Sequence, residues 1–281
     1  MNASGASAGL GLVSAATWGG SDFVGGMGAR RSPALLVVAS GHVVSLLLLA
    51  AICLSAHIPL PGRHELLLAG VAGLEGSLSL VLFYRALSLG AMGLTAALTG
   101  LLTALIPVLY SLATEGMPGR LTLAGLALGL VAIWLITHTP AENGPASPPA
   151  ALLLGALAGT GFGTQLIFFK MASSGGVLWN MTSARFAGTV GLLLVILVKP
   201  PHGAGRAFWQ FGIPSGLLDT VGTLVYLRAV EFGRLDVAAV VCSLYPAGTI
   251  LLAALVLHER PSRRQLAGVA VALGAVMLLS A

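Results

Sequence analysis

The stretch FYRALSLG at residues 83–90 recurs as YLRAVEFG at residues 226–233, and this repetition decides the fold. A single shift of 143 residues, without a gap, superimposes residues 73–125 on residues 216–268. The matches that chance would rarely give in so apolar a chain are Arg85 with Arg228 and Pro118 with Pro261. A long repeat of this kind indicates two copies of one structural unit.

The composition is that of a membrane protein. Among the 281 residues, 57% are hydrophobic and 8% are charged, and the mean hydropathy is +0.96, whereas soluble domains carry about 25% charged residues. So few charges cannot cover a surface that faces water. The net charge of +5 comes mostly from residues at the ends of apolar segments, which is typical of membrane flanks rather than of a nucleic-acid-binding patch.

Ten apolar segments are long enough to cross the hydrocarbon core as helices of about 20 residues. We expect them at residues 8–29, 33–56, 65–88, 91–113, 120–138, 150–172, 177–198, 207–230, 235–257 and 264–281. A polar linker at residues 139–149 divides them into five and five. The sequence therefore predicts an all-α integral membrane protein with ten transmembrane helices, in which residues 1–138 and 150–281 are two five-helix repeats.

The odd number of helices in each unit sets how the two units lie in the membrane. Because each copy crosses the membrane five times, two copies in tandem must enter it from opposite sides. The expected arrangement is a pair of inverted repeats. This arrangement is typical of secondary transporters, whose substrate site lies between the repeats near the membrane midplane.

Ionisable side chains inside the apolar segments are the first candidates for function. Each costs about 2.5–3.5 kcal/mol to insert, so such side chains usually face a cavity or a charged partner. The candidates for coupling transport to a proton or another cation are Asp22, His42, Glu75 and Asp219. Glu75 lies ~15 Å deep in its segment by helical rise, and Asp219 occupies nearly the same place in the second copy, one residue out of register.

Each of these candidates also has a structural interpretation. Arg85 or Arg185 can neutralise Glu75 and Asp219 as structural ion pairs. A histidine in an apolar helix is commonly a packed core residue, and Asp22 can be wetted by headgroups if it lies near the end of its helix.

Polar and aromatic side chains on the same segments are the candidates for substrate binding. They are Trp18, Ser79, Tyr84, Arg185, Thr223, Tyr226 and Tyr245. Trp18 lies four residues before Asp22 and therefore shares its helix face. Arg185 corresponds to His42 at the shift of 143, and a guanidinium can pair with a carboxylate or bind an anionic substrate group.

Other kinds of chemistry are not indicated. Cys53 and Cys242 lie inside apolar segments, as buried free thiols do. The sequence contains no P-loop, HExxH or CxxC motif, so we predict no enzyme, no cofactor and no metal site. Arg85 and Arg228 lie near the ends of their segments, where we expect them to reach the membrane interface.

Four motifs carry a resemblance to a known family. They are Trp18-Gly19, the stretch 83–90, Tyr245-Pro246, and Glu259-Arg260-Pro261 followed by residues 265–268. Together they resemble the EamA branch of the drug/metabolite transporter superfamily, over essentially the whole chain and best in its second half. The resemblance implies the ten-helix fold and a secondary transporter driven by an ion gradient, most relatives being exporters of metabolites, amino acids or drugs.

The proline motif differs between the two copies. Pro246 has no counterpart in the first copy, where Thr103 stands. Pro107 lies one turn later, so the kink of the first copy is expected to be displaced to that position.

The resemblance implies that both termini lie in the cytoplasm, and the loop charges oppose this. In that orientation the inner loops hold four cations, namely Arg63, Arg120, Lys170 and Arg234. The outer loops hold seven, namely Arg30, Arg31, Lys199, Arg206, Arg260, Arg263 and Arg264. Cytoplasmic loops normally carry the excess of Lys and Arg, so the count favours the reverse orientation. The prediction that we keep is the orientation that the resemblance implies.

The predicted function is that of a proton-coupled exporter of small metabolites, amino acids or drugs in the plasma or inner membrane. Its cavity is expected between the first four helices of each copy, because the ionisable residues cluster in the first, second, third, seventh and eighth segments. The alternatives are an uncoupled facilitator or channel on the same fold, and a membrane enzyme acting on lipids, for which no residues are suitably spaced. The expected partners are a small-molecule substrate, the lipid bilayer and a proton or other cation, and not nucleic acid.

Overall fold

A computed structural model describes residues 3–89, 92–137, 148–203, 205–256 and 262–280, and all regular structure in these ranges is helical. The first half contains α1 (Ala3–Ala29), α2 (Ala34–Ser55), α3 (Arg63–Ser88), α4 (Met92–Thr114) and α5 (Arg120–Thr137). The second half contains α6 (Pro149–Met171), the short 3-10 helix η1 (Ser173–Gly175), α7 (Val177–Val198), α8 (Ala207–Phe232), α9 (Leu235–Cys242), α10 (Tyr245–Val256) and α11 (Arg263–Ser280). The all-helical fold predicted from the sequence is confirmed. Most of the predicted linker, residues 138–147, lies outside the described residues.

The helices are suited to a membrane. Within the described ranges, α2, α3, α6 and α7 are each long and apolar enough to cross one. Large apolar side chains face outward on these helices, with Leu197 and Val198 of α7 76% and 86% exposed. Such surfaces are normal where the solvent is lipid.

The ninth predicted segment is divided into α9 and α10, which the sequence prediction did not separate. Pro246 has no N–H to donate to the carbonyl of Cys242, so the helical ladder cannot continue through it. The chain turns instead, with Leu244 N–H donating to Val241 O at 3.2 Å and Ala247 N–H donating to Leu244 O at 2.9 Å. Pro107 lies inside α4 without dividing it, so the first half has no matching break at that position.

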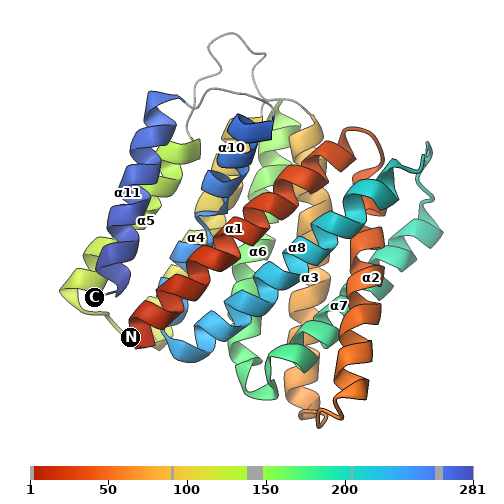
Figure 1. Cartoon of the computed structure of the whole chain (residues 1–281), viewed down its shortest axis with the longest axis horizontal. Coiled ribbons are helices and arrows are strands. Elements are labelled where there is room, and N and C mark those ends of the chain that lie inside the picture. Colours follow the sequence, from red (N-terminus) through yellow and green to blue (C-terminus); the bar gives the residue numbers. More distant parts are fainter. Residues whose placement is uncertain (1–2, 90–91, 138–147, 204, 257–261, 281) are drawn as a thin grey trace.

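The main packing contacts join helices of different halves. α1 lies along α8, α3 packs on both α6 and α7, α2 packs on α8, and α4 packs on α6 (Figure 1). α5 and α11 pair with each other at one side of the molecule (Figure 1). Each half is therefore completed by the other.

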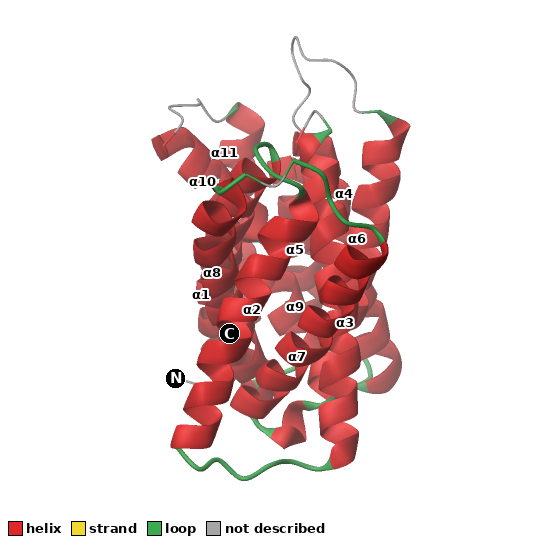
Figure 2. Ribbon diagram, turned by 90° about the vertical axis from the view of Figure 1, so that its right-hand side faces the viewer, coloured by secondary structure: helices red, strands yellow, loops and turns green. Residues whose placement is uncertain are grey.

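The first helices of the two halves, α1 and α6, begin at opposite ends of the molecule (Figure 1). The N-terminus and the C-terminus lie at the same end of the molecule (Figure 1), and the helices stand side by side along one common direction (Figure 2). α1 begins at the end that carries the termini, whereas α6 begins at the opposite end. We call these two ends the terminal end and the far end.

Close contacts between helices follow the sequence repeat. Gly41 of α2 meets Gly216 of α8 backbone to backbone, so a Cβ on either glycine would clash. Gly73 of α3 meets Ala184 of α7 in the same way. The shift of 143 residues converts the second pair of positions into the first, so equivalent small residues bring equivalent helices together.

Candidate functional site

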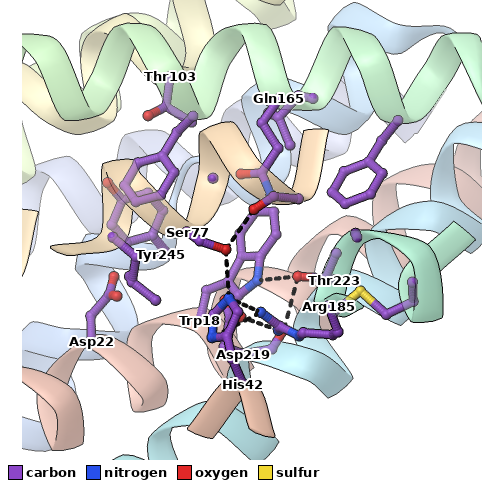
Figure 3. A pocket seen from close by; sticks show the side chains of 18 residues that line it. Trp18, Asp22, His42, Ser77, Thr103, Gln165, Arg185, Asp219, Thr223 and Tyr245 are labelled. Carbon is purple, nitrogen blue, oxygen red and sulfur yellow. Dashed lines mark hydrogen bonds and ion pairs between the residues drawn. The ribbon is translucent and has the colours of Figure 1, made fainter. Parts of the chain in front are cut away.

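A cavity lies between the two halves (Figure 3). Its described lining residues come from α1, α2, α3, α4, α6, α7, α8 and α10. None of them comes from α5 or α11, in agreement with the distribution of ionisable residues in the sequence. The space open to the centre of a water molecule is about 60 Å³, so the cavity holds a compact ligand or a few waters.

An ion pair between Arg185 of α7 and Asp219 of α8 forms one wall of the cavity (Figure 3). Nη2 of Arg185 donates to Asp219 Oδ2 and, at 3.0 Å, to Thr220 Oγ1. The two charged side chains are 6% and 19% exposed. Of the two partners that the sequence left open for Arg185, the structure selects Asp219 and not Glu75.

The hydrogen bonds of His42 define its protonation state. Its Nδ1 lies 3.1 Å from Val38 O, and its Nε2 lies 2.7 Å from Arg185 Nη1. A carbonyl only accepts hydrogen bonds and a guanidinium only donates them. Nδ1 must therefore carry the proton and Nε2 must accept, so we assign His42 as a neutral imidazole. Ser77 Oγ lies 2.9 Å from the same Nε2.

Residues from matching positions of the two halves meet in this cluster. His42 and Arg185 are equivalent at the shift of 143 and bond to each other. Ser77 beside His42 is equivalent to Thr220 beside Arg185. A residue can contact its own counterpart only near the axis that relates the two copies, so the cluster marks the centre of the molecule.

Asp22 of α1 lines the cavity apart from this cluster (Figure 3). Asp22 has no hydrogen bond or ion pair with any side chain in the described parts of the chain, in contrast to Asp219. Trp18, one helical turn away, also lines the cavity and donates from Nε1 to Thr223 Oγ1 at 3.3 Å. Across from α1, Tyr245 of α10 completes this part of the wall.

Two buried polar atoms of the cavity are without partners. Tyr245 Oη lies near Thr103 but makes no hydrogen bond of normal geometry within the described residues, and the same is true of Arg185 Nε. Both residues are 5% exposed as a whole. Unsatisfied buried polar groups are uncommon, and here they border an open space that a ligand can enter.

Glu75 does not reach the cavity, although the sequence places it beside Asp219. It lies between α3 and α6, where Thr164 Oγ1 donates to Oε1 at 2.5 Å and Oε2 has no partner among the described residues. Each residue turns a helix by 100°, so one step out of register points the two carboxylates in different directions. Gly76, the true counterpart of Asp219, does line the cavity.

Three other predicted substrate-binding residues are packed outside the cavity. Ser79 is buried beside Gly161 of α6. Tyr84 Oη lies 2.9 Å from Ser215 Oγ. Tyr226 donates to Leu166 O at 3.0 Å, and its ring packs 5.9 Å from that of Trp18.

The two arginines near helix ends lie where the sequence predicts. Arg85 and Arg228 are both exposed, and Arg228 pairs with Glu231 at 2.5 Å. Cys53 and Cys242 are buried free thiols, also as expected.

Several lining residues escaped the sequence analysis. The polar ones are Ser77, Thr103 and Gln165, and the apolar ones include Phe162, Phe169 and Met181. The internal repeat of the sequence identifies two of these residues, because their counterparts in the other half also line the cavity or border it. Ser77 matches Thr220 at the shift of 143, and Phe162 matches Trp18 at a shift of 144.

The fold of the chain and the sequence of its second half both have counterparts among known proteins. A protein of known crystal structure shares the fold with a TM-score of 0.76 at 18% identity, over 97% of each chain. An uncharacterized protein of Methanocaldococcus jannaschii is 26% identical over 132 residues, which are 46% of this chain and 96% of that protein. Residues 149–281 match the model of the EamA-like transporter family. The second half of the chain is thus similar to the EamA-like transporter family, in agreement with the resemblance seen in the sequence, and its long apolar helices are those of a multi-pass membrane protein.

Proposed function

We propose that the chain is a proton-coupled secondary transporter that exports a small organic substrate through the cavity between its halves. The observation that carries the proposal is the pairing of charges in that cavity. One carboxylate, Asp219, is held by Arg185, and a second, Asp22, is free of any cationic partner in the described residues. Lone acids within membrane segments commonly mark ion pathways and proton relays.

An inverted repeat supports alternating access. α1 and α6 start from opposite ends of the molecule, and interchanging the halves turns the α1–α8 contact into α6–α3 and the α2–α8 contact into α7–α3. In transporters built this way, one unit rocks against the other around a fixed central site. The Methanocaldococcus jannaschii relative matches this chain over 132 residues, which is about the length of one half.

Asp22 is the residue that we assign to proton coupling. The ionisable side chains that face it are Asp219 of α8, Tyr245 of α10 and Tyr84 of α3. None of these is a cation, so nothing among the described neighbours fixes Asp22 in the charged form. Asp219 is a poorer choice, because releasing it would leave the Arg185 guanidinium unpaired in the membrane.

The test is substrate-driven proton movement in liposomes that contain a pH-sensitive dye. The purified protein is challenged with amino acids, nucleosides and organic amines, each in turn. We expect one class to change the internal pH with the wild type and with Glu75→Gln, and no change with Asp22→Asn. Glu75→Gln is a matched control, because it removes a membrane carboxyl that lies outside the cavity.

Two results would contradict the proposal. Full proton movement in Asp22→Asn would remove Asp22 from the coupling step. Uptake of a labelled substrate that is unaffected when the proton gradient is collapsed would identify an uncoupled facilitator.

A further inference from the structure

The net charge of the residues that line the cavity determines which ligand charge is favoured, if the cavity is the substrate site of the proposed function. Two carboxylates and one guanidinium line the space. The charge of Arg185 is balanced by Asp219 through Nη2, and His42 is neutral because both of its ring nitrogens have their hydrogen-bond roles fixed. When Asp22 is ionised, the cavity therefore carries one uncompensated negative charge.

The walls around Asp22 suit an organic cation. Trp18 lies one turn before Asp22 on α1, so the indole and the carboxylate share a helix face. Phe162 and Phe169 of α6 and Tyr245 of α10 also line the cavity. Aromatic rings attract cations through their faces, most strongly when water is excluded, and they provide contact area for an apolar body.

Tyr245 adds a specific acceptor. Its Oη is buried, borders the cavity and makes no hydrogen bond of normal geometry within the described chain. An ammonium group has several N–H donors and can therefore reach a carboxylate and a phenol oxygen at once. A carboxylate ligand could accept a hydrogen bond from the phenol, but it would be repelled by the Asp22 carboxylate.

We propose that the cavity binds a compact organic ammonium compound. Its nitrogen pairs with Asp22 and donates to Tyr245 Oη, while its apolar body packs against Trp18 and Phe162. The volume of about 60 Å³ that is open to water centres restricts this body to a small one.

The experiment is equilibrium binding of three molecules that have nearly one shape and different charges. Benzylamine is cationic at neutral pH, benzyl alcohol is neutral and benzoate is anionic. Binding to the purified protein is measured by calorimetry without any gradient, so the result does not depend on coupling. We expect benzylamine to bind the wild type at least about tenfold more tightly than the other two, a difference of roughly 1.4 kcal/mol.

Substitutions of Asp22 and Tyr245 test which side chains contact the bound ammonium group. Asp22→Asn should weaken benzylamine binding by about tenfold or more, and Tyr245→Phe by a smaller factor, because it removes the hydroxyl and keeps the ring. Glu75→Gln should bind as the wild type does. Asp22→Glu, which keeps the charge, should restore most of the affinity lost in Asp22→Asn, and thermal unfolding of each variant shows that it is folded.

The outcomes separate this inference from the transporter proposal. Equal binding of benzylamine and benzoate, no benzylamine binding to the wild type, or undiminished benzylamine binding to folded Asp22→Asn would each overturn the ammonium site. If another class of compound then moved protons in liposomes through Asp22, the transporter proposal would stand without it. Selective benzylamine binding that produces no proton movement would support the site and count against coupling.

Discussion

The two carboxylates of the cavity differ in what their removal leaves behind. Asp219 balances Arg185, which has no other acidic partner in the described structure. Asp22 balances no charge. Removing one member of a buried ion pair leaves the other charge unpaired in a medium of low polarity. Removing an acid that has no cationic partner instead eliminates the free-energy cost of burying it. The same chemical change at the two positions should therefore have opposite effects on stability.

Asp219→Asn is expected to destabilise the protein by about 3–5 kcal/mol, because the Arg185 guanidinium is left without its counter-charge. Asp22→Asn is expected to leave stability unchanged or to raise it. Thermal unfolding of both variants in the same detergent measures the difference. Equal melting temperatures for the two variants would show that the ion pair contributes nothing.

A double substitution serves as the control for this prediction. Replacing both partners, as Arg185→Met with Asp219→Leu, removes the stranded charge as well as the pair. Replacement of buried ion pairs by apolar residues is often neutral or stabilising. The double variant should therefore be more stable than Asp219→Asn, although we expect it to lose transport.

Among the elements, α9 is fixed at the terminal end by a cationic clamp. Arg234 at its start donates to Gly116 O at 2.9 Å, to Glu115 O at 3.3 Å and to Asp236 Oδ2 at 2.9 Å. Asp236 is fully buried, and its hydrogen bonds raise the pKa of the Arg234 guanidinium, which therefore stays charged. The clamp joins the end of α4 to the start of α9 and closes this part of the terminal end.

We expect the contacts of Arg234 to break when the protein opens at its terminal end. Arg234→Ala should accelerate maleimide labelling of Cys242, which is buried on α9 in the wild type. We expect an increase of about tenfold, because hydrogen bonds to charged groups contribute roughly 1.5–3 kcal/mol. Mass spectrometry of the labelled peptides measures the extent of maleimide labelling at Cys242 and at Cys53 separately.

Arg228→Ala is the matched control for the clamp. Arg228 lies at the same end, but its side chain is 57% exposed and pairs only with Glu231 among the described residues. Labelling of Cys242 in this variant should equal that of the wild type, and labelling of Cys53 should be unchanged in both variants. Equal acceleration by the two substitutions would mean that the clamp has no gating role.

Sequence reasoning located the helices better than it located the site. Helix ends were predictable because apolar runs stop at prolines, glycines and charged residues, as at Pro33 and Arg120. The division at Pro246 was not predicted, because an apolar run of sufficient length conceals a broken helix. The lining of the cavity depends on how each helix is rotated, which the sequence does not show: Asp22 and Asp219 line the cavity, whereas Glu75 does not.

The whole molecule has a strong difference in charge between its two ends. Within the described residues, the far end carries seven cations and no acid: Arg30, Arg31, Arg85, Lys199, Arg206, Arg263 and Arg264. The terminal end carries five cations and four acids: Arg63, Arg120, Lys170, Arg228 and Arg234, with Glu65, Glu115, Glu231 and Asp236. The structure adds that Arg228 and Arg234 are bound in ion pairs, which strengthens the contrast seen in the loop counts.

The charge difference leads to a prediction about orientation. Cytoplasmic loops carry the excess of Lys and Arg, so the charge difference favours the far end in the cytoplasm and both termini outside it, in opposition to the orientation that the family resemblance implies. Alkaline phosphatase fused after Ala281 should then be active in intact cells, and green fluorescent protein fused there should be dark. Fluorescence of the green fluorescent protein fusion would contradict this prediction and would support cytoplasmic termini, which the family resemblance implies.

The contact between His42 and Arg185 has a consequence for the ancestry of the chain. If two copies of the second half assembled alone, they would bring two guanidinium groups face to face at the centre, without room for both charges. Two copies of the first half would bring together two imidazoles, with Gly76 in the place of Asp219 and His42 in the place of Arg185. We therefore expect that neither half can substitute for the other and that the central cluster needs both halves in one polypeptide.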